Sequence, residues 1–245
     1  MALVTGGSRG IGRACALALA RDGFDVAVNY RRDRDAAAET VQAIEALGRR
    51  ARSYQAGVDS ADDDASMVAA VLEDFGAIDT LVHAAGIASR GHSVADTDPS
   101  ELERVMAVHA LGAHHLCRLV LPAMRGAPRG DVVFVSSVAA KMLAANGAPY
   151  NMAKAALEAL AMTLAKEERR HGIHVNVVAP GLVVTDMGRR LVRAAMGVED
   201  ISSLDANSPF GRVCRPEDVA GVVRFLCSSE AGYLTGQVIT VDGGG

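Results

Sequence analysis

Three residues of this sequence, Ser137, Tyr150 and Lys154, form a group that can move a proton to or from an oxygen atom. Tyr150 and Lys154 are four residues apart, which places both side chains on one face of a helix, about one turn from each other. Because a free tyrosine has a pKa of about 10, we expect a nearby lysine charge to favour the phenolate and to lower the pKa of Tyr150. Ser137 follows an apolar, strand-like run, and its hydroxyl can hold a carbonyl oxygen. Such a group suits reduction of C=O or oxidation of CH–OH, although Tyr-x-x-x-Lys alone often occurs by chance.

A glycine-rich turn near the N-terminus is the second candidate site. Residues 5–12 have the sequence TGGSRGIG and lie between an apolar run and an amphipathic stretch. Glycines let the backbone approach a phosphate closely, and the start of the following helix offers free N–H groups to an anion. The glycine spacing is one residue wider than the common dinucleotide fingerprint. We predict a dinucleotide site that includes Gly6, Ser8, Arg9, Gly10, Ile11 and Gly12.

The end of the second predicted strand indicates which dinucleotide binds. NAD sites usually carry an acid there for the ribose 2′-hydroxyl, whereas NADP sites offer an arginine to the 2′-phosphate. The chain has Arg31 and Arg32 at this point, and no acid occurs before Asp33. We therefore predict NADP, with Arg31 as the phosphate partner and Arg9 as a second one. NAD stays the alternative, and Arg32 has a simpler interpretation as solvated surface.

Composition excludes several classes of function. Half of the 245 residues are hydrophobic, which is enough for a core on both faces of a sheet. The net charge of −4 argues against a nucleic-acid partner. The 4 cysteines are scattered, which indicates reduced thiols and neither disulfides nor a metal site. Neither a signal peptide nor an apolar stretch of about 20 residues is visible, so we expect a cytoplasmic protein without a membrane partner.

Short apolar runs alternate with amphipathic stretches along the whole chain. Strands are predicted at residues 2–5, 25–29, 52–56, 80–83, 131–136, 174–179 and 238–241. Helices are predicted at residues 10–21, 35–47, 62–75, 99–124, 148–171 and 216–228. This alternation predicts a parallel sheet covered on both faces, with ligands at the carboxyl ends of the strands. We expect one α/β domain over residues 1–245, with a Rossmann-like doubly wound sheet of about seven strands.

Residues 186–210 interrupt this alternation. The segment is long and weakly periodic, and it contains the helix breakers Gly188, Gly197, Asn207 and Pro209. Two interpretations are open: an irregular surface insertion, or a lid over the substrate, because long ordered loops in compact domains are often functional.

Together these residues resemble the short-chain dehydrogenase/reductase family. The matching segments occur in the family's order and cover essentially the whole chain: residues 5–12, 84–86, 137, 150, 154, 176–181, 185, 211–220, 234–237 and 241–244. The resemblance implies that Tyr150 gives its proton to a carbonyl oxygen as hydride arrives from the nicotinamide. It also implies that Lys154 lowers the pKa of Tyr150 and binds the nicotinamide ribose, and that Ser137 orients the carbonyl. Further cofactor contacts are implied at Ala84, Ala85, Gly86, Pro180, Gly181 and Thr185.

Three positions depart from the family pattern. His83, followed by Ala84, stands where an asparagine is expected before Ala-Gly, and Gly57 stands where an aspartate often lies beside the adenine. His109 replaces a helix asparagine that supports a water-mediated proton relay in relatives. Since imidazole titrates near neutrality, His109 can be a substitute relay, and so a candidate catalytic residue, or a core histidine with a satisfied hydrogen bond. Both interpretations are open.

The favoured function is an NADPH-dependent carbonyl reductase, and the whole-chain pattern is most similar to the 3-oxoacyl-acyl-carrier-protein reductase type. That similarity implies a small carbonyl or alcohol substrate, or a carrier-protein or CoA thioester, and a homotetramer or homodimer. One alternative is an NAD-dependent dehydrogenase of alcohols, sugars or steroids. Another is a low-turnover nucleotide-binding protein, against which the intact Ser137, Tyr150 and Lys154 argue.

Overall fold

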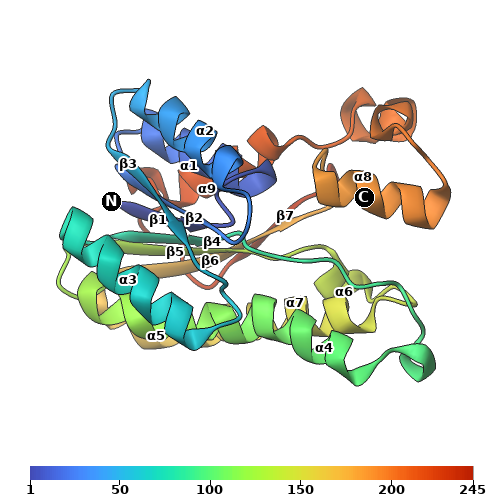
Figure 1. Ribbon diagram of the computed structural model, residues 1–245, viewed down its shortest axis with the longest axis horizontal. Coiled ribbons are helices and arrows are strands. Elements are labelled where there is room, and N and C mark those ends of the chain that lie inside the picture. The colour runs from blue at the N-terminus through green and yellow to red at the C-terminus, as the bar shows by residue number, and fades with distance from the viewer. Residues whose placement is uncertain (245) are drawn as a thin grey trace.

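A twisted sheet of parallel strands forms the centre of the molecule (Figure 1). The computed structural model describes residues 1–244, and within them the sheet has 7 strands in the order β3-β2-β1-β4-β5-β6-β7. The strands are β1 (Ala2–Thr5), β2 (Val26–Tyr30), β3 (Ala51–Gln55), β4 (Thr80–His83), β5 (Gly130–Val135), β6 (Ile173–Pro180) and β7 (Val238–Val241). Strand order reverses between β1 and β4, which is where a doubly wound sheet opens a crevice at its carboxyl edge. The predicted fold class is confirmed.

Helices cover both faces of the sheet (Figure 1). One layer contains α1 (Gly10–Arg21), α2 (Arg34–Glu45) and α9 (Pro216–Leu226), and the other contains α3 (Ala61–Phe75), α5 (Gly112–Met124) and α7 (Ala148–Glu168). Successive strand residues point to opposite faces, so Ala2 and Val4 pack under the first layer and Leu3 under the second. Among the described residues, no helix combines the length and apolar character that crossing a bilayer requires.

The helix predicted at residues 99–124 is divided in the structure. It consists of α4 (Pro99–Met106), a π-helical turn at Ala107–Leu111, and α5. The turn and the start of α5 contact two loops that are distant in the sequence: His109 bonds to Ile87 after β4, and a Cβ on Gly112 would lie 2.1 Å from the Val58 carbonyl oxygen after β3. The turn therefore connects this helix with the loops after β3 and β4, a feature typical of functional positions.

The expectation of irregular structure across residues 186–210 is wrong for its first half. Residues Asp186–Met196 form α8, which begins with Thr185 capping the Gly188 N–H at 3.0 Å and ends at Gly197 with φ of 67°. Only Gly188 and Val192 of this helix are buried, although its polar and apolar residues are clearly separated on two faces, a helical pattern that the sequence already contained. The 3₁₀ turns Ile201–Asn207 and Pro209–Gly211 follow, and α8 lies at the same end of the molecule as the short α6 (Ala139–Met142) (Figure 1).

Candidate active site

The glycine-rich turn connects β1 to α1 and is held by Asn29 at the end of β2. The Gly6 N–H donates to Asn29 Oδ1 at 3.2 Å, and the Gly7 N–H donates to the Asn29 carbonyl at 2.9 Å. Gly6 has a φ of 62°, and a Cβ on Gly12 would lie 2.3 Å from the Gly6 carbonyl oxygen. The turn can therefore close only with glycine at these positions.

Loops that follow two other strands, β4 and β6, approach this turn. A Cβ on Gly6 would lie 2.9 Å from Ala85 Cα after β4, and one on Gly10 would lie 3.4 Å from Thr185 Cγ2 after β6. Within residues 1–244, no side chain caps the first N–H groups of α1. Uncapped N–H groups and a close-approach glycine backbone form a cradle for an anion, and this cradle fits the pyrophosphate of a dinucleotide. Of the other residues predicted in this turn, Ser8 is buried, Ile11 is partly buried and Arg9 is exposed.

Sequence reasoning missed Thr5, which organises the loop after β4. Its Oγ1 accepts hydrogen bonds from the Ala84 N–H at 3.2 Å and the Ala85 N–H at 3.1 Å, and it lies 3.1 Å from His83 Nδ1. Because both lone pairs of the hydroxyl are used, its hydrogen points to Nδ1 and the His83 hydrogen is on Nε2. Burial and the nearby Lys154 lower the pKa of His83 to about 3. Thr5 and Asn29 are polar residues within apolar strands, and this pattern in the sequence could have marked them as residues that organise the site.

Ser137, Tyr150 and Lys154 lie where β5 meets α7. Lys154 Nζ donates to the Val135 carbonyl at 2.7 Å and lies 5.6 Å from the centre of the Tyr150 ring. Lys154 is 4% exposed, and burial lowers its pKa to about 7. Pro180 is held beside this group because its carbonyl accepts the Val138 N–H at 3.0 Å, and the Gly181 N–H donates to Val241.

The pKa of Tyr150 does not follow the direction expected from the sequence. Burial raises the pKa of this phenol, and a hydrogen bond with the Ser137 hydroxyl opposes that rise. The reason for the difference is that desolvation acts on both members of the pair: it favours the neutral phenol of Tyr150 and the neutral amine of Lys154. In the protein without cofactor, Tyr150 therefore holds its proton at neutral pH.

His109 lies against Tyr150 from the π-helical turn. The two rings meet edge to face, with centres 5.3 Å apart and planes at 89°. His109 Nε2 lies 2.8 Å from the Ile87 carbonyl oxygen and 3.2 Å from the Ile87 nitrogen. A Cβ on Gly86 would lie 2.7 Å from the imidazole, so the glycine makes room for this ring.

The hydrogen bonding of His109 fits neither sequence interpretation fully. Nε2 has a partner, as a core histidine requires, but Nδ1 is buried and has none within residues 1–244. Burial and the nearby Lys154 lower the pKa of His109 well below its usual range, so the ring is neutral at physiological pH. Its placement beside Tyr150 and the loop after β4 assigns it a position in the site, and its role there stays a prediction.

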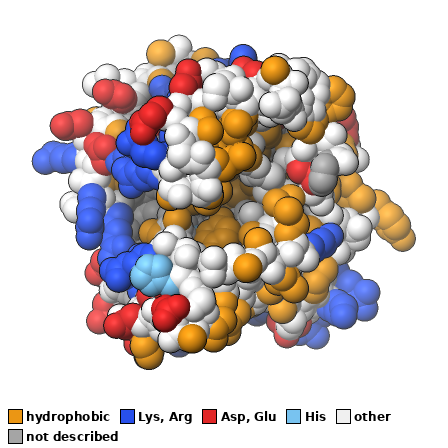
Figure 2. Space-filling model, turned by 90° about the vertical axis from the view of Figure 1, so that its right-hand side faces the viewer, with side chains coloured by type: hydrophobic (Ala, Val, Ile, Leu, Met, Phe, Trp, Pro, Cys, Tyr) orange, Lys and Arg blue, Asp and Glu red, His pale blue; other side chains and the backbone are white. Residues whose placement is uncertain are grey.

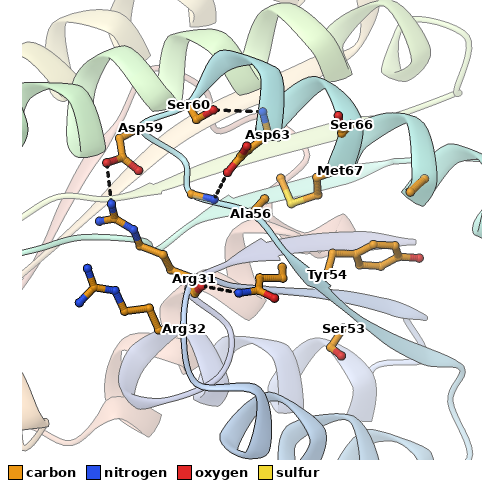
Figure 3. Close-up of a pocket in the computed structure, with 13 residues that line it drawn as sticks. Arg31, Arg32, Ser53, Tyr54, Ala56, Asp59, Ser60, Asp63, Ser66 and Met67 are labelled. Atoms are coloured by element: carbon orange, nitrogen blue, oxygen red, sulfur yellow. Dashed lines mark hydrogen bonds and ion pairs between the residues drawn. The ribbon is translucent and has the colours of Figure 1, made fainter.

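A polar cavity of ≈ 770 Å³ lies at the carboxyl ends of β2 and β3 (Figure 3). Arg31 and Arg32 line one side, and Gly57, Asp59 and Asp63 line the other. Arg31 Nη2 is 3.0 Å from Asp59 Oδ2. By the strand order, this is where the adenosine half of a dinucleotide would lie.

The arginines predicted to bind a 2′-phosphate already have carboxylate partners. Arg31 pairs with Asp59, and Arg9 lies 2.6 Å from Asp33 and 3.6 Å from Asp186. Arg32 makes no ion pair with any residue that the structure describes. The Arg31–Asp59 pair could not be predicted from the sequence. Across the same 1–244 range, no cluster of His, Cys, Asp and Glu is suited to hold a metal ion.

Known proteins resemble this chain along its whole length. Residues 6–245 match a family model described as enoyl-(acyl carrier protein) reductase. The chain is 36% identical over 244 residues to a 3-oxoacyl-[acyl-carrier-protein] reductase of Staphylococcus epidermidis, covering 99% of this chain and 97% of the relative. It is 38% identical over 245 residues to one of Synechocystis, with coverage of 100% and 96%. The crystal structure of acetoin dehydrogenase from Enterobacter cloacae superposes with a TM-score of 0.89 at 31% identity, covering 100% of this chain and 94% of that one.

Proposed function

Because the chain belongs to the short-chain dehydrogenase/reductase family of NAD(P)-dependent oxidoreductases, we propose that it reduces a ketone with NADPH, using Tyr150 as the proton donor. The observation that carries this proposal is a chain of contacts from the glycine cradle to the phenol. Gly6 faces Ala85, Gly86 faces His109, and His109 meets the Tyr150 ring. A nicotinamide bound through the cradle would thus lie within reach of Ser137, Tyr150 and Lys154.

The bound nicotinamide would supply the hydride, and the protein's own groups would handle the oxygen. Ser137 Oγ would donate a hydrogen bond to the carbonyl oxygen and orient it. The Tyr150 phenol, protonated at neutral pH because burial raises its pKa, would transfer its proton as the oxygen gains charge. Lys154, whose pKa is lowered to about 7, would then stabilise the phenolate with its ammonium form.

The cofactor would be held by groups already described. The glycine turn, with Gly6, Gly10 and Gly12 and the start of α1, would hold the pyrophosphate, and Thr185 closes the cradle from the β6 side. Pro180 and Gly181, whose backbone is held by Val138 and Val241, would border the nicotinamide. Arg31 and Arg9 would approach a 2′-phosphate on the ribose.

The substrate side of the molecule favours a ketone with an apolar chain. Figure 2 shows a hollow at the end of the molecule that carries α6 and α8, with hydrophobic side chains around it. Large apolar residues are exposed on these two segments: Met142 and Leu143 on the α6 side, and Leu191 and Met196 on α8. A 3-oxoacyl thioester fits this chemistry, and α8 would be the lid over it.

NADPH consumption with a panel of ketones tests the proposal. The panel contains a 3-oxoacyl thioester, an unbranched apolar ketone and acetoin, followed by the absorbance of the reduced nicotinamide. We expect turnover with the apolar ketones, and about a 100- to 10,000-fold lower kcat in Tyr150→Phe with NADPH binding retained. The matched control is Tyr233→Phe, because Tyr233 is fully exposed. Full activity in Tyr150→Phe would refute the proposed chemistry, and tight NADPH binding without turnover of any ketone would favour a nucleotide-binding protein.

One observation favours the alternative of NAD-dependent oxidation. The two arginines placed for a 2′-phosphate are both paired with carboxylates, so they do not offer free positive charge. Dissociation constants for NADH and NADPH separate the alternatives, since tighter binding of NADH would make the NADPH assignment wrong.

A further inference from the structure

Arg31 and Asp59 form an ion pair across the mouth of the cavity at the carboxyl ends of β2 and β3 (Figure 3). The backbone of Arg31 is fixed, because Gln55 Nε2 donates to its carbonyl at 3.2 Å. The Arg31 side chain is 48% exposed and that of Asp59 is 22% exposed. The guanidinium thus lies at the cavity surface with one of its donor edges turned toward a carboxylate.

Gly57 is what allows Asp59 to take this position. A Cβ on Gly57 would lie 2.8 Å from Asp59 Oδ1, a separation that real Cβ atoms essentially never show. The Gly57 N–H also donates to Asp63 Oδ2 at 3.0 Å, which fixes the glycine backbone beneath the Asp59 carboxylate. A side chain at residue 57 would therefore force the Asp59 carboxylate to shift from its present position beside Arg31.

We propose that Asp59 is a specificity-determining residue that weakens the binding of NADPH relative to NADH by holding Arg31. This inference rests on the proposed dinucleotide site and deepens it. A 2′-phosphate can use Arg31 fully only after the guanidinium releases Asp59. The phosphate, which carries about two negative charges, then lies close to a carboxylate that has lost its partner. A 2′-hydroxyl has no charge, so NADH meets neither cost.

The surrounding charges do not remove this effect. Asp63 lines the cavity together with Asp59 and adds a second negative charge there, with its Oδ2 accepting the Gly57 N–H. Arg32 lines the opposite side without an ion pair among the described residues, and it supplies attraction that keeps NADPH binding possible. With repulsion from Asp59 and Asp63 and attraction from Arg32, we expect the protein to prefer NADPH over NADH less strongly than its two consecutive arginines suggest.

Cofactor binding to Asp59→Asn tests the proposal. Dissociation constants for NADPH and NADH are measured on the full chain from the fluorescence of the reduced nicotinamide. We expect NADPH to bind about 5- to 10-fold more tightly to the variant, and NADH to change by less than about twofold. Asp62→Asn is the matched control, because Asp62 is an exposed carboxylate in the first turn of α3 and has the same charge. It should leave the ratio of the two constants within about twofold of the native one.

Two further variants separate the ion pair from other effects. Gly57→Ser should displace the carboxylate and move the NADPH:NADH ratio in the same direction as Asp59→Asn. In Arg31→Ala, adding Asp59→Asn should tighten NADPH binding by a smaller factor, because there is no guanidinium left to release.

The other outcomes overturn the inference. Equal weakening of NADPH and NADH in Asp59→Asn would mean that Asp59 contacts a part common to both cofactors. Unchanged constants, or a change equal to that in Asp62→Asn, would mean that the pair has no role in selectivity. If the native protein binds neither cofactor, the proposed function fails together with this inference, a result that the native titration alone reveals.

Discussion

Lys154 and Arg31 are the cations at the two ends of the proposed dinucleotide site, and they differ in burial and in the partners that they contact. Lys154 is 4% exposed, and its ammonium has the Val135 carbonyl as its hydrogen-bond acceptor. Arg31 is 48% exposed and pairs with the carboxylate of Asp59. The first cation has lost most of its hydration without gaining a full counter-charge, whereas the second keeps both water and a partner.

Because of this difference, we expect Lys154 to influence proton transfer and Arg31 to influence the choice between NADPH and NADH. A buried, poorly compensated amine has its pKa brought near neutrality, so small changes around it alter proton transfer strongly. An exposed ion pair contributes little to folding and can exchange its carboxylate for a phosphate at modest cost. We therefore expect large effects of substitution at the catalytic end and small, ligand-specific effects at the adenosine end.

Removing the buried amine should give the largest effect. In Lys154→Met, whose side chain has similar length, we expect kcat to fall by about 100- to 1,000-fold because no cation stabilises the Tyr150 phenolate. The unfolding free energy should also lose part of its pH dependence. Between the folded pKa of about 7 and the ordinary value of 10.5, the unfolded chain binds a proton that the folded chain does not. The native protein therefore gains stability as pH rises through this window, by at most about 1.4 kcal/mol per pH unit.

Urea unfolding of both proteins at pH 7, 8 and 9 measures this slope. The native curve should rise more steeply with pH than that of Lys154→Met, whereas parallel curves would mean that Lys154 stays fully charged in the fold. Because only the difference between the two proteins is used, titration of groups distant from Lys154 cancels.

Several strands, and the placement of Tyr150 and Lys154 on one helix, could be predicted from local sequence. Apolar runs bounded by glycine or polar residues placed β1, β4 and β7 at the observed residues. For β1 and β4 the reason is burial on both faces of a parallel sheet, which leaves a strong apolar signal. The spacing of Tyr150 and Lys154 placed them on one helix, α7, for the same local reason.

Features that depend on distant contacts could not be predicted in this way. The π-helical turn around His109 depends on Ile87 and Val58, which lie far away in the chain. The raised pKa of Tyr150 depends on burial by the folded chain, which the four-residue spacing does not contain. The pairing of Arg31 with Asp59 joins residues that follow two different strands, β2 and β3, which only the folded sheet brings together.

The two buried histidines, His83 and His109, should make the stability of the protein depend on pH in the acid range. Burial lowers the pKa values of His83 and His109 and keeps both rings neutral in the folded protein. Below about pH 6.5, these two histidines therefore bind protons in the unfolded chain but not in the folded one. Stability is therefore full above that pH and falls as pH decreases, by up to about 1.4 kcal/mol per pH unit for each histidine. His109→Asn should remove one of these contributions and flatten the acid slope.

Unfolding of His109→Asn by urea between pH 4.5 and 6.5 measures the change. The control is His92→Asn, since His92 is exposed and should leave the slope as it is. An unaltered slope in His109→Asn would show that this ring titrates normally and is not enclosed beside Tyr150. A kcat that falls with a shifted pH profile, at unchanged NADPH affinity, would in addition assign His109 a part in proton transfer.

The smallest effect on the fold should come from the exposed cation. In Arg31→Ala, we expect the dissociation constant of NADPH to rise by about 5- to 20-fold and that of NADH by less than about twofold, because only the 2′-phosphate uses the guanidinium. The unfolding free energy should change by less than about 1 kcal/mol, since the lost partner, Asp59, keeps access to water. Titrations at low and high salt extend the test. The ratio of NADPH affinity to NADH affinity in the native protein should fall as salt screens the phosphate charge, and this ratio should depend less on salt in the variant. Equal losses for both cofactors, or a large loss of stability, would mean that Arg31 is a structural residue like the buried groups at the catalytic end.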